Sequence, residues 1–103
     1  MVTRARGART VTAMTEFLVE LYVSREDPAA VQQGAARARL AGQEMTDEGT
    51  PVRYLRSLYV PEDETCFFFY LARCVDDVRE AARRAALPFD RISEAIESDQ
   101  AGG

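Results

Sequence analysis

The sequence predicts one small α+β domain whose elements follow the order β-α-β-β-α-β. A chain of 103 residues has room for a single domain and one modest core. Four segments show the alternation or the β-branched and aromatic content of strands, and two show helical spacing of apolar residues. With right-handed crossovers, this order gives a four-stranded antiparallel sheet with both helices on one face.

The first predicted strand runs from Thr15 to Val23, with the sequence TEFLVELYV. Its side chains alternate, so one face is wholly apolar and the other is mixed. The apolar face holds Phe17, Val19, Leu21 and Val23, and the mixed face holds Leu18, Glu20 and Tyr22.

The first predicted helix follows Asp27-Pro28, a pair that suits an N-cap followed by proline in the first helical position. Its buried face is a narrow stripe of mostly small side chains, which allows close approach to a sheet. The stripe consists of Val31, Ala35, Ala38, Gly42 and Met45. The turn residues from Thr46 to Pro51 end the helix.

A hairpin follows, with strands over Val52–Val60 and Thr65–Leu71 and a four-residue polar turn, Pro61–Glu64. Both arms are rich in aromatic and β-branched residues. In the second arm both faces are apolar. One face carries Phe67, Phe69 and Leu71, and the other carries Cys66, Phe68 and Tyr70.

The second helix is predicted over Val75–Ala86, with acidic residues in its first turn and arginines near its end, as the helix dipole favours. Its inward residues are Val75, Val78, Ala82 and Ala85, and Leu87-Pro88 ends it. Residues Asp90–Glu97 could form a helix or a strand. We favour an edge strand that places Ile92, Glu94 and Ile96 on one face, because a fourth strand completes the sheet.

Charge divides the chain into a basic start and an acidic domain. Residues 1–13 carry Arg4, Arg6 and Arg9 and no acid, and we expect a flexible tail unless translation begins at Met14. The rest of the chain has ten basic and 17 acidic residues, a net charge of −7. An acidic domain argues against nucleic-acid binding. We expect residues 14–97 to form the domain and residues 98–103 a disordered end.

Several function classes find no support in the sequence. No apolar stretch is long enough for a membrane span or a secretory signal, so we expect a cytoplasmic protein. The chain has no histidine, the commonest general base and metal ligand, and no phosphate-binding or hydrolase motif. The sequence therefore argues against an enzyme.

The predicted fold leaves one face of the sheet without helices, and two candidate sites follow. We expect Leu18, Tyr22, Phe68 and Tyr70 on this face, an apolar surface that a second copy would cover in a homodimer. A cleft between the paired sheets would hold Glu20, Tyr22, Tyr70, Cys66 and either Arg53 or Arg56, of which we favour Arg56. These groups could bind a small ligand or a cation, or could simply pair with one another across the interface.

The second candidate site is the acidic turn of the hairpin. Glu62, Asp63 and Glu64 are hard oxygen donors that could hold a divalent ion, and Cys66 would add a thiol. The alternative is that the carboxylates serve only solubility. Cys66 and Cys74 are expected as free thiols and not as a disulfide, because we expect a cytoplasmic protein. Two cysteines without histidine do not make a structural zinc site either.

Long phrases of the sequence resemble a family of small bacterial ferredoxin-like domains of formerly unknown function. The resemblance covers Met14 to Glu97 and is most specific in RYLRSLYVPEDETCF and ALPFDRI. The family includes a dimeric nickel-binding protein, so the resemblance implies a ferredoxin-like fold, a homodimer, and nickel binding or sequestration at the surface. The chain departs from the family pattern at Phe68, at Leu71–Arg73 and at Cys74.

Three functions are therefore open. The first is a dimeric protein that binds nickel or another divalent metal ion. The second is a small-molecule-binding module, or a cofactor-independent enzyme, that uses the cleft between paired sheets of a dimeric α/β barrel. The third is a structural or regulatory partner domain without a ligand.

Overall fold

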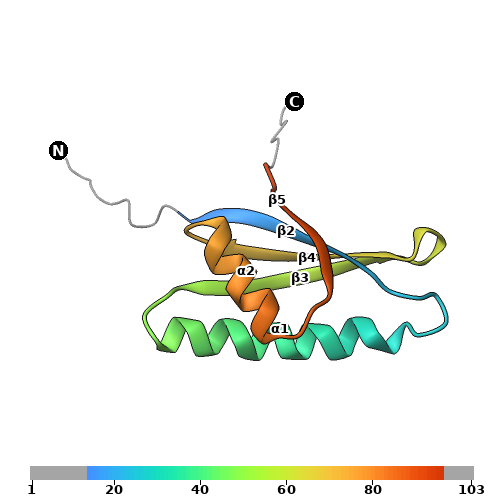
Figure 1. Ribbon diagram of the computed structural model, residues 1–103, viewed down its shortest axis with the longest axis horizontal. Helices are drawn as coiled ribbons and strands as arrows, with labels where there is room; N and C mark the ends of the chain where they lie inside the picture. Colours follow the sequence, from blue (N-terminus) through green and yellow to red (C-terminus); the bar gives the residue numbers. More distant parts are fainter. Residues whose placement is uncertain (1–13, 97–103) are drawn as a thin grey trace.

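Four antiparallel strands form one sheet in the order β3-β4-β2-β5, and two helices cover one of its faces (Figure 1). The computed structural model describes residues 14–96. The elements are β2 (Thr15–Tyr22), α1 (Ala29–Asp47), β3 (Val52–Val60), β4 (Thr65–Ala72), α2 (Val75–Arg84) and β5 (Phe89–Glu94), with a short 3-10 helix, η2 (Pro61–Asp63), in the hairpin turn. The predicted α+β, ferredoxin-like arrangement is confirmed.

The element boundaries differ from the predicted ones by a few residues at the ends. Helix α1 begins after Pro28, which occupies the N-cap position, and no side chain caps it, although Asp27 was expected to do so. Helix α2 ends at Arg84. Strand β5 ends at Glu94, so Ile96 lies beyond it and is exposed. The expected tail and C-terminal end lie outside the described residues.

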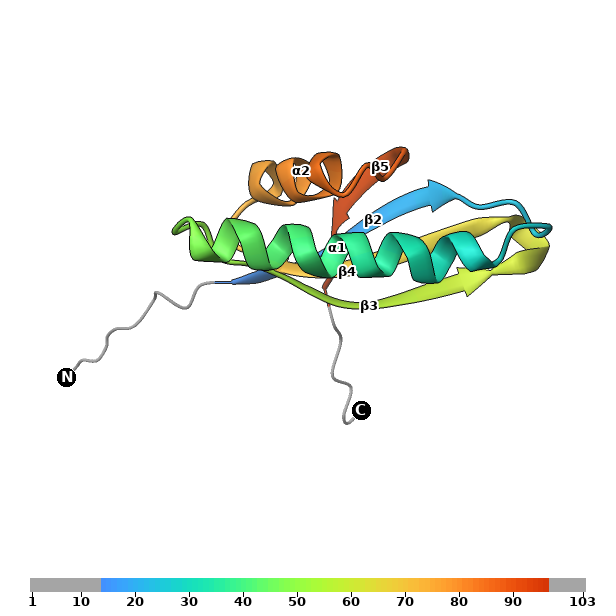
Figure 2. The ribbon, with the colours of Figure 1, turned by 90° about the horizontal axis from the view of Figure 1, so that it is seen from below.

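The helices pack closely on the sheet because the stripe along α1 consists of small residues. Its buried residues are Gly34, Ala35, Ala38, Ala41, Gly42 and Met45. A Cβ on Gly42 would lie 3.1 Å from the carbonyl oxygen of Val52, so a side chain there would push α1 away from β3. Viewed from below, α1 runs along the sheet while the shorter α2 lies beside its C-terminal half (Figure 2).

Strand β4 presents the opposite face to the helices from the one expected. Val19 pairs with Phe68 and Phe17 pairs with Tyr70, so these residues share a face in the antiparallel register. That face is the covered one, where Cys66, Phe68 and Tyr70 are fully buried. The expectation that Phe68, Tyr70 and Cys66 lie on the open face is therefore wrong. Alternation could not decide it, because both faces of β4 are apolar.

An ion-pair cluster joins the two helices at the surface. The Arg84 guanidinium on α2 lies 3.1 Å from Glu44 of α1, 3.0 Å from Glu48, the residue that follows α1, and 2.8 Å from Glu80 of α2. Its hydrogen bonds lower the pKa of the Glu48 and Glu80 carboxyls. Because α1 has no basic residue in its last turn, Arg84 also offsets negative charge at the end of that helix.

Two tyrosines allow a matched test of the packing. The buried hydroxyl of Tyr70 has no hydrogen-bond partner among the described residues, whereas the Tyr59 hydroxyl donates to the Val23 carbonyl at 2.8 Å. We expect Tyr70→Phe to raise the free energy of unfolding by ~1 kcal/mol and Tyr59→Phe to lower it by ~1 kcal/mol. Urea denaturation measures both. A clear loss of stability in Tyr70→Phe would mean that its hydroxyl is satisfied.

The helix-joining cluster predicts a pH dependence of stability. Carboxyls with lowered pKa values in the folded state stabilise it above their unfolded pKa, about 4.3, and this stabilisation is lost as the pH falls through the folded value. Urea denaturation across this acidic range should show a steeper loss for the wild type than for Arg84→Gln. Arg79→Gln, which removes only an exposed pair with Asp76, should behave like the wild type. Equal slopes for the wild type and Arg84→Gln would contradict this role of Arg84.

Candidate functional site

The face of the sheet away from the helices, called here the open face, is largely apolar. Its residues follow from the register, since directly paired residues share a face. Tyr22 and Leu58 are 59% and 55% exposed, and the others are half-buried. The apolar members are Leu18 and Tyr22 of β2, Leu58 of β3, and Phe67, Phe69 and Leu71 of β4.

The two carboxylates of the open face, on Glu16 and Glu20, are already paired with arginines of the chain. Glu20 of β2 lies 3.3 Å from Arg91 of β5, and Glu16 lies 3.4 Å from Arg56 of β3. The Arg56 guanidinium also stacks on the ring of Phe69, with its central carbon 4.1 Å from the ring centre. On this face, which no helix covers, the carboxylates are therefore neutralised by arginines, and Arg56 is also held by the ring of Phe69.

The structure brings together only part of the predicted cleft. Glu20, Tyr22 and Arg56 lie on the open face, but Tyr70 lies in the core on the other side of the sheet. Burial raises the pKa of the Tyr70 hydroxyl well above its usual range.

The two arginines of β3 share the open face because of a register shift. A shift between Tyr54 and Arg56 pairs Arg53 with Leu71 and Arg56 with Phe69, so both guanidinium groups belong to this face. Sequence reasoning expected one of them and also missed Arg91. Arg91 lies opposite Glu20, a pairing that only the β2–β5 register reveals.

The acidic turn of the hairpin is built by η2 and by Glu64, which adopts a left-handed backbone conformation with φ of 50°. The Glu64 carboxylate accepts a hydrogen bond from the Arg25 backbone N–H at 2.9 Å and lies 3.5 Å from the Arg25 Nε. Its carbonyl accepts from Val23 at 3.0 Å. Glu64 therefore fastens the hairpin tip to the loop before α1, while Glu62 and Asp63 remain exposed.

Cys66 does not complete a metal site with this turn. Its side chain is buried on the helix-covered face, and burial raises the pKa of its thiol to about 11, which disfavours the thiolate that binds metals. Among residues 14–96, no three Cys, Asp or Glu side chains come together as metal ligands. The four predicted ligands thus do not fit a nickel site in this structure. The other thiol, Cys74, is exposed at the start of α2.

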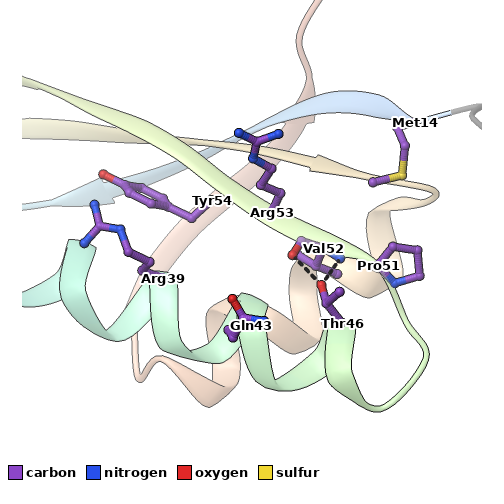
Figure 3. Close-up of a pocket in the computed structure, with 8 residues that line it drawn as sticks. All are labelled: Met14, Arg39, Gln43, Thr46, Pro51, Val52, Arg53 and Tyr54. Carbon is purple, nitrogen blue, oxygen red and sulfur yellow. Dashed lines mark hydrogen bonds between the residues drawn. The ribbon is translucent and has the colours of Figure 1, made fainter.

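A hollow of about 510 Å³ lies beside the edge strand β3, between it and the C-terminal half of α1 (Figure 3). The Thr46 hydroxyl bonds both the N–H and the C=O of Val52 and so covers the start of this strand edge. Arg39 lies 5.3 Å from the ring centre of Tyr54, and Arg53 points away from α1. The residues that line this hollow include no carboxylate, and the Thr46 hydroxyl is engaged by the backbone of Val52.

Comparison with known proteins identifies the family. A family described as "Nickel responsive protein SCO4226-like" matches residues 17–95, most of the chain. The chain belongs to this SCO4226-like family. No curated protein gives a significant match.

The fold agrees with that of a solved structure of SCO4226, the protein that gives the family its description. The crystal structure of SCO4226 from Streptomyces coelicolor A3(2) matches with a TM-score of 0.62 at 19% sequence identity. The match covers 81% of this chain and 98% of the solved one. At this identity the likeness shows the fold alone. Among the described residues, neither helix is long and apolar enough to cross a membrane.

Proposed function

We propose that the protein is a homodimer that takes part in nickel handling and binds the ion weakly through surface carboxylates. The single observation that supports the dimer is the open face of the sheet. Six large apolar side chains lie on it, and the helices cover only the opposite face. A contiguous exposed apolar surface of this kind marks an interaction site.

The charges of the open face suit a second copy of the same chain. Glu16 and Glu20 already have arginine partners, so burying this face leaves no unpaired carboxylate. A two-fold axis through the face would bring the same patch of each copy together, with Phe69 and Phe67 at its centre. The result is a paired-sheet dimer with an apolar centre and charged edges, as interfaces commonly have.

A ligand-binding cleft between the paired sheets has less support. Its best candidates, Glu20 and Arg56, are engaged with Arg91 and Glu16, and Tyr70 is buried elsewhere. The open face therefore offers an apolar surface to a partner rather than free polar groups to a small molecule.

Nickel binding rests on the family and on the chemistry of the surface. The family is described as nickel responsive, and the chain has a net charge of −4. Glu62 and Asp63 are exposed neighbours at the hairpin tip and form no ion pair within the described residues. Imidazole and thiolate suit nickel better than carboxylate does. Without histidine, and with Cys66 buried, binding would be weak and poorly selective.

The dimer predicts that a charge placed on the open face will separate the copies. We expect Phe69→Glu to sediment as a monomer and the wild type as a dimer, because a carboxylate would be buried without a partner. Leu40→Glu is the control, since Leu40 is 71% exposed on α1. It should leave the dimer intact. A wild type that sediments as a monomer at all accessible concentrations would refute the dimer.

Nickel binding is tested by calorimetric titration of protein without a histidine tag. We expect saturable but weak nickel binding, little stronger than that of magnesium, and a further loss in the double variant Glu62→Gln/Asp63→Asn. The double variant Asp90→Asn/Glu94→Gln removes the same charge from β5 and should bind as the wild type does. Absence of saturable heat with either ion would rule out the metal-binding part of the proposal.

A further inference from the structure

A second hollow, of about 440 Å³, opens beside the N-terminal half of α1. It arises because α1 has 19 residues and α2 only ten, so α2 flanks the C-terminal half of α1 alone (Figure 2). The chain after α2 closes the remaining side with Leu87 and Pro88. The hollow lies on the helix side of the sheet and shares one lining residue, Tyr22, with the open face.

The floor of this hollow is apolar, and at Gly34 the backbone of α1 packs directly against it. Leu21, Phe68 and Leu87 form it, and all three belong to the core. A Cβ on Gly34 would lie 3.1 Å from Phe68 Cζ and 3.2 Å from Leu87 Cδ2. Any side chain at position 34 would therefore have to displace Phe68 or Leu87 and so change the shape of the floor.

The rim carries a cation that is held in place but has no acidic partner. Arg37 Nε donates to the carbonyl of Ala85 at 2.7 Å, which fixes the guanidinium at the end of α2. No carboxylate of residues 14–96 lies within ion-pair distance of it, and its terminal nitrogens donate to no group there. In the described region most other arginines have such a partner, which makes Arg37 the available charge of this hollow.

The other charged residue of the rim does not neutralise Arg37. Asp27 lies ten residues earlier, roughly 15 Å away along the helix axis. The first turn of α1 contains no acidic residue either. The end of the hollow near Arg37 therefore favours an anion, and the floor favours an apolar body.

We infer that this hollow binds a small carboxylate with an apolar chain. The chain would lie on Leu21, Phe68 and Leu87, and the carboxylate would meet the free nitrogens of Arg37. The volume falls within the usual range for small-molecule sites, which are mostly apolar with a few placed polar groups. Guanidinium is well matched to carboxylate because it can donate two parallel hydrogen bonds.

Octanoate is a suitable probe, with octanol and octylamine as matched compounds of equal chain length. In NMR titrations of the full chain, octanoate should shift the methyl signals of Leu21 and Leu87 and bind more tightly than octanol or octylamine. Arg37→Gln should weaken octanoate binding about tenfold or more and leave octanol binding unchanged. Arg39→Gln, which alters an arginine of the same helix outside this hollow, should change neither.

Three results would overturn the inference. They are unshifted Leu21 and Leu87 methyl signals at saturating octanoate, unchanged octanoate affinity in Arg37→Gln, and tighter binding of octylamine than of octanoate. If Arg37→Gln does not fold, the wild-type preference between octanoate and octanol decides the question. These readouts are independent of dimerisation and of nickel.

Discussion

Strand β4 is apolar on both faces, and β2 adds Leu18 and Tyr22 to the face that the two helices cannot cover. On the covered side, Phe17, Val19, Phe68 and Tyr70 form the middle of the core. On the other side, Leu18, Phe67 and Phe69 remain at the surface. Burial of apolar area is the main stabilising term in a small domain. The helices therefore stabilise the inner face of the sheet, whereas the apolar side chains of the outer face would be buried only by contact with a partner.

The way the helices cover the inner face explains the hollow beside α1. Small residues at positions 34, 35, 38 and 42 let α1 lie close to the sheet. Helix α2 fills that space only as far as Arg84, and the Arg84 cluster ties the two helices together there. Beyond it, Gly34 has no neighbouring helix. The difference in length between the two helices, and not the small residues of α1, therefore leaves room at this end.

The sequence predicted the order and type of the four strands and the two α-helices; local signals sufficed for all of them except β5, which was chosen as a strand because it completes the sheet. It could not assign the faces of β4, since Cys66-Phe68-Tyr70 and Phe67-Phe69-Leu71 are equally apolar. The register with β2 decides between them, and register is a tertiary property. That ambiguity misplaced Tyr70 and Cys66, and the separate β2–β5 register was needed to identify Arg91 as the partner of Glu20. The candidate cleft was therefore only partly predictable.

Net charge also overstates how many carboxylates are free to bind a metal ion. Glu16, Glu20 and Glu64 each hold an arginine from another segment, and three more glutamates surround or flank Arg84. A cation entering these places would have to displace a guanidinium that already makes charge-assisted hydrogen bonds. The carboxylates available without such displacement lie mainly in exposed turns, as Glu62 and Asp63 do. Exposed carboxylates are hydrated and mobile. The affinity of such a turn for a metal ion is therefore limited by its few oxygen donors and not by the overall charge of the chain.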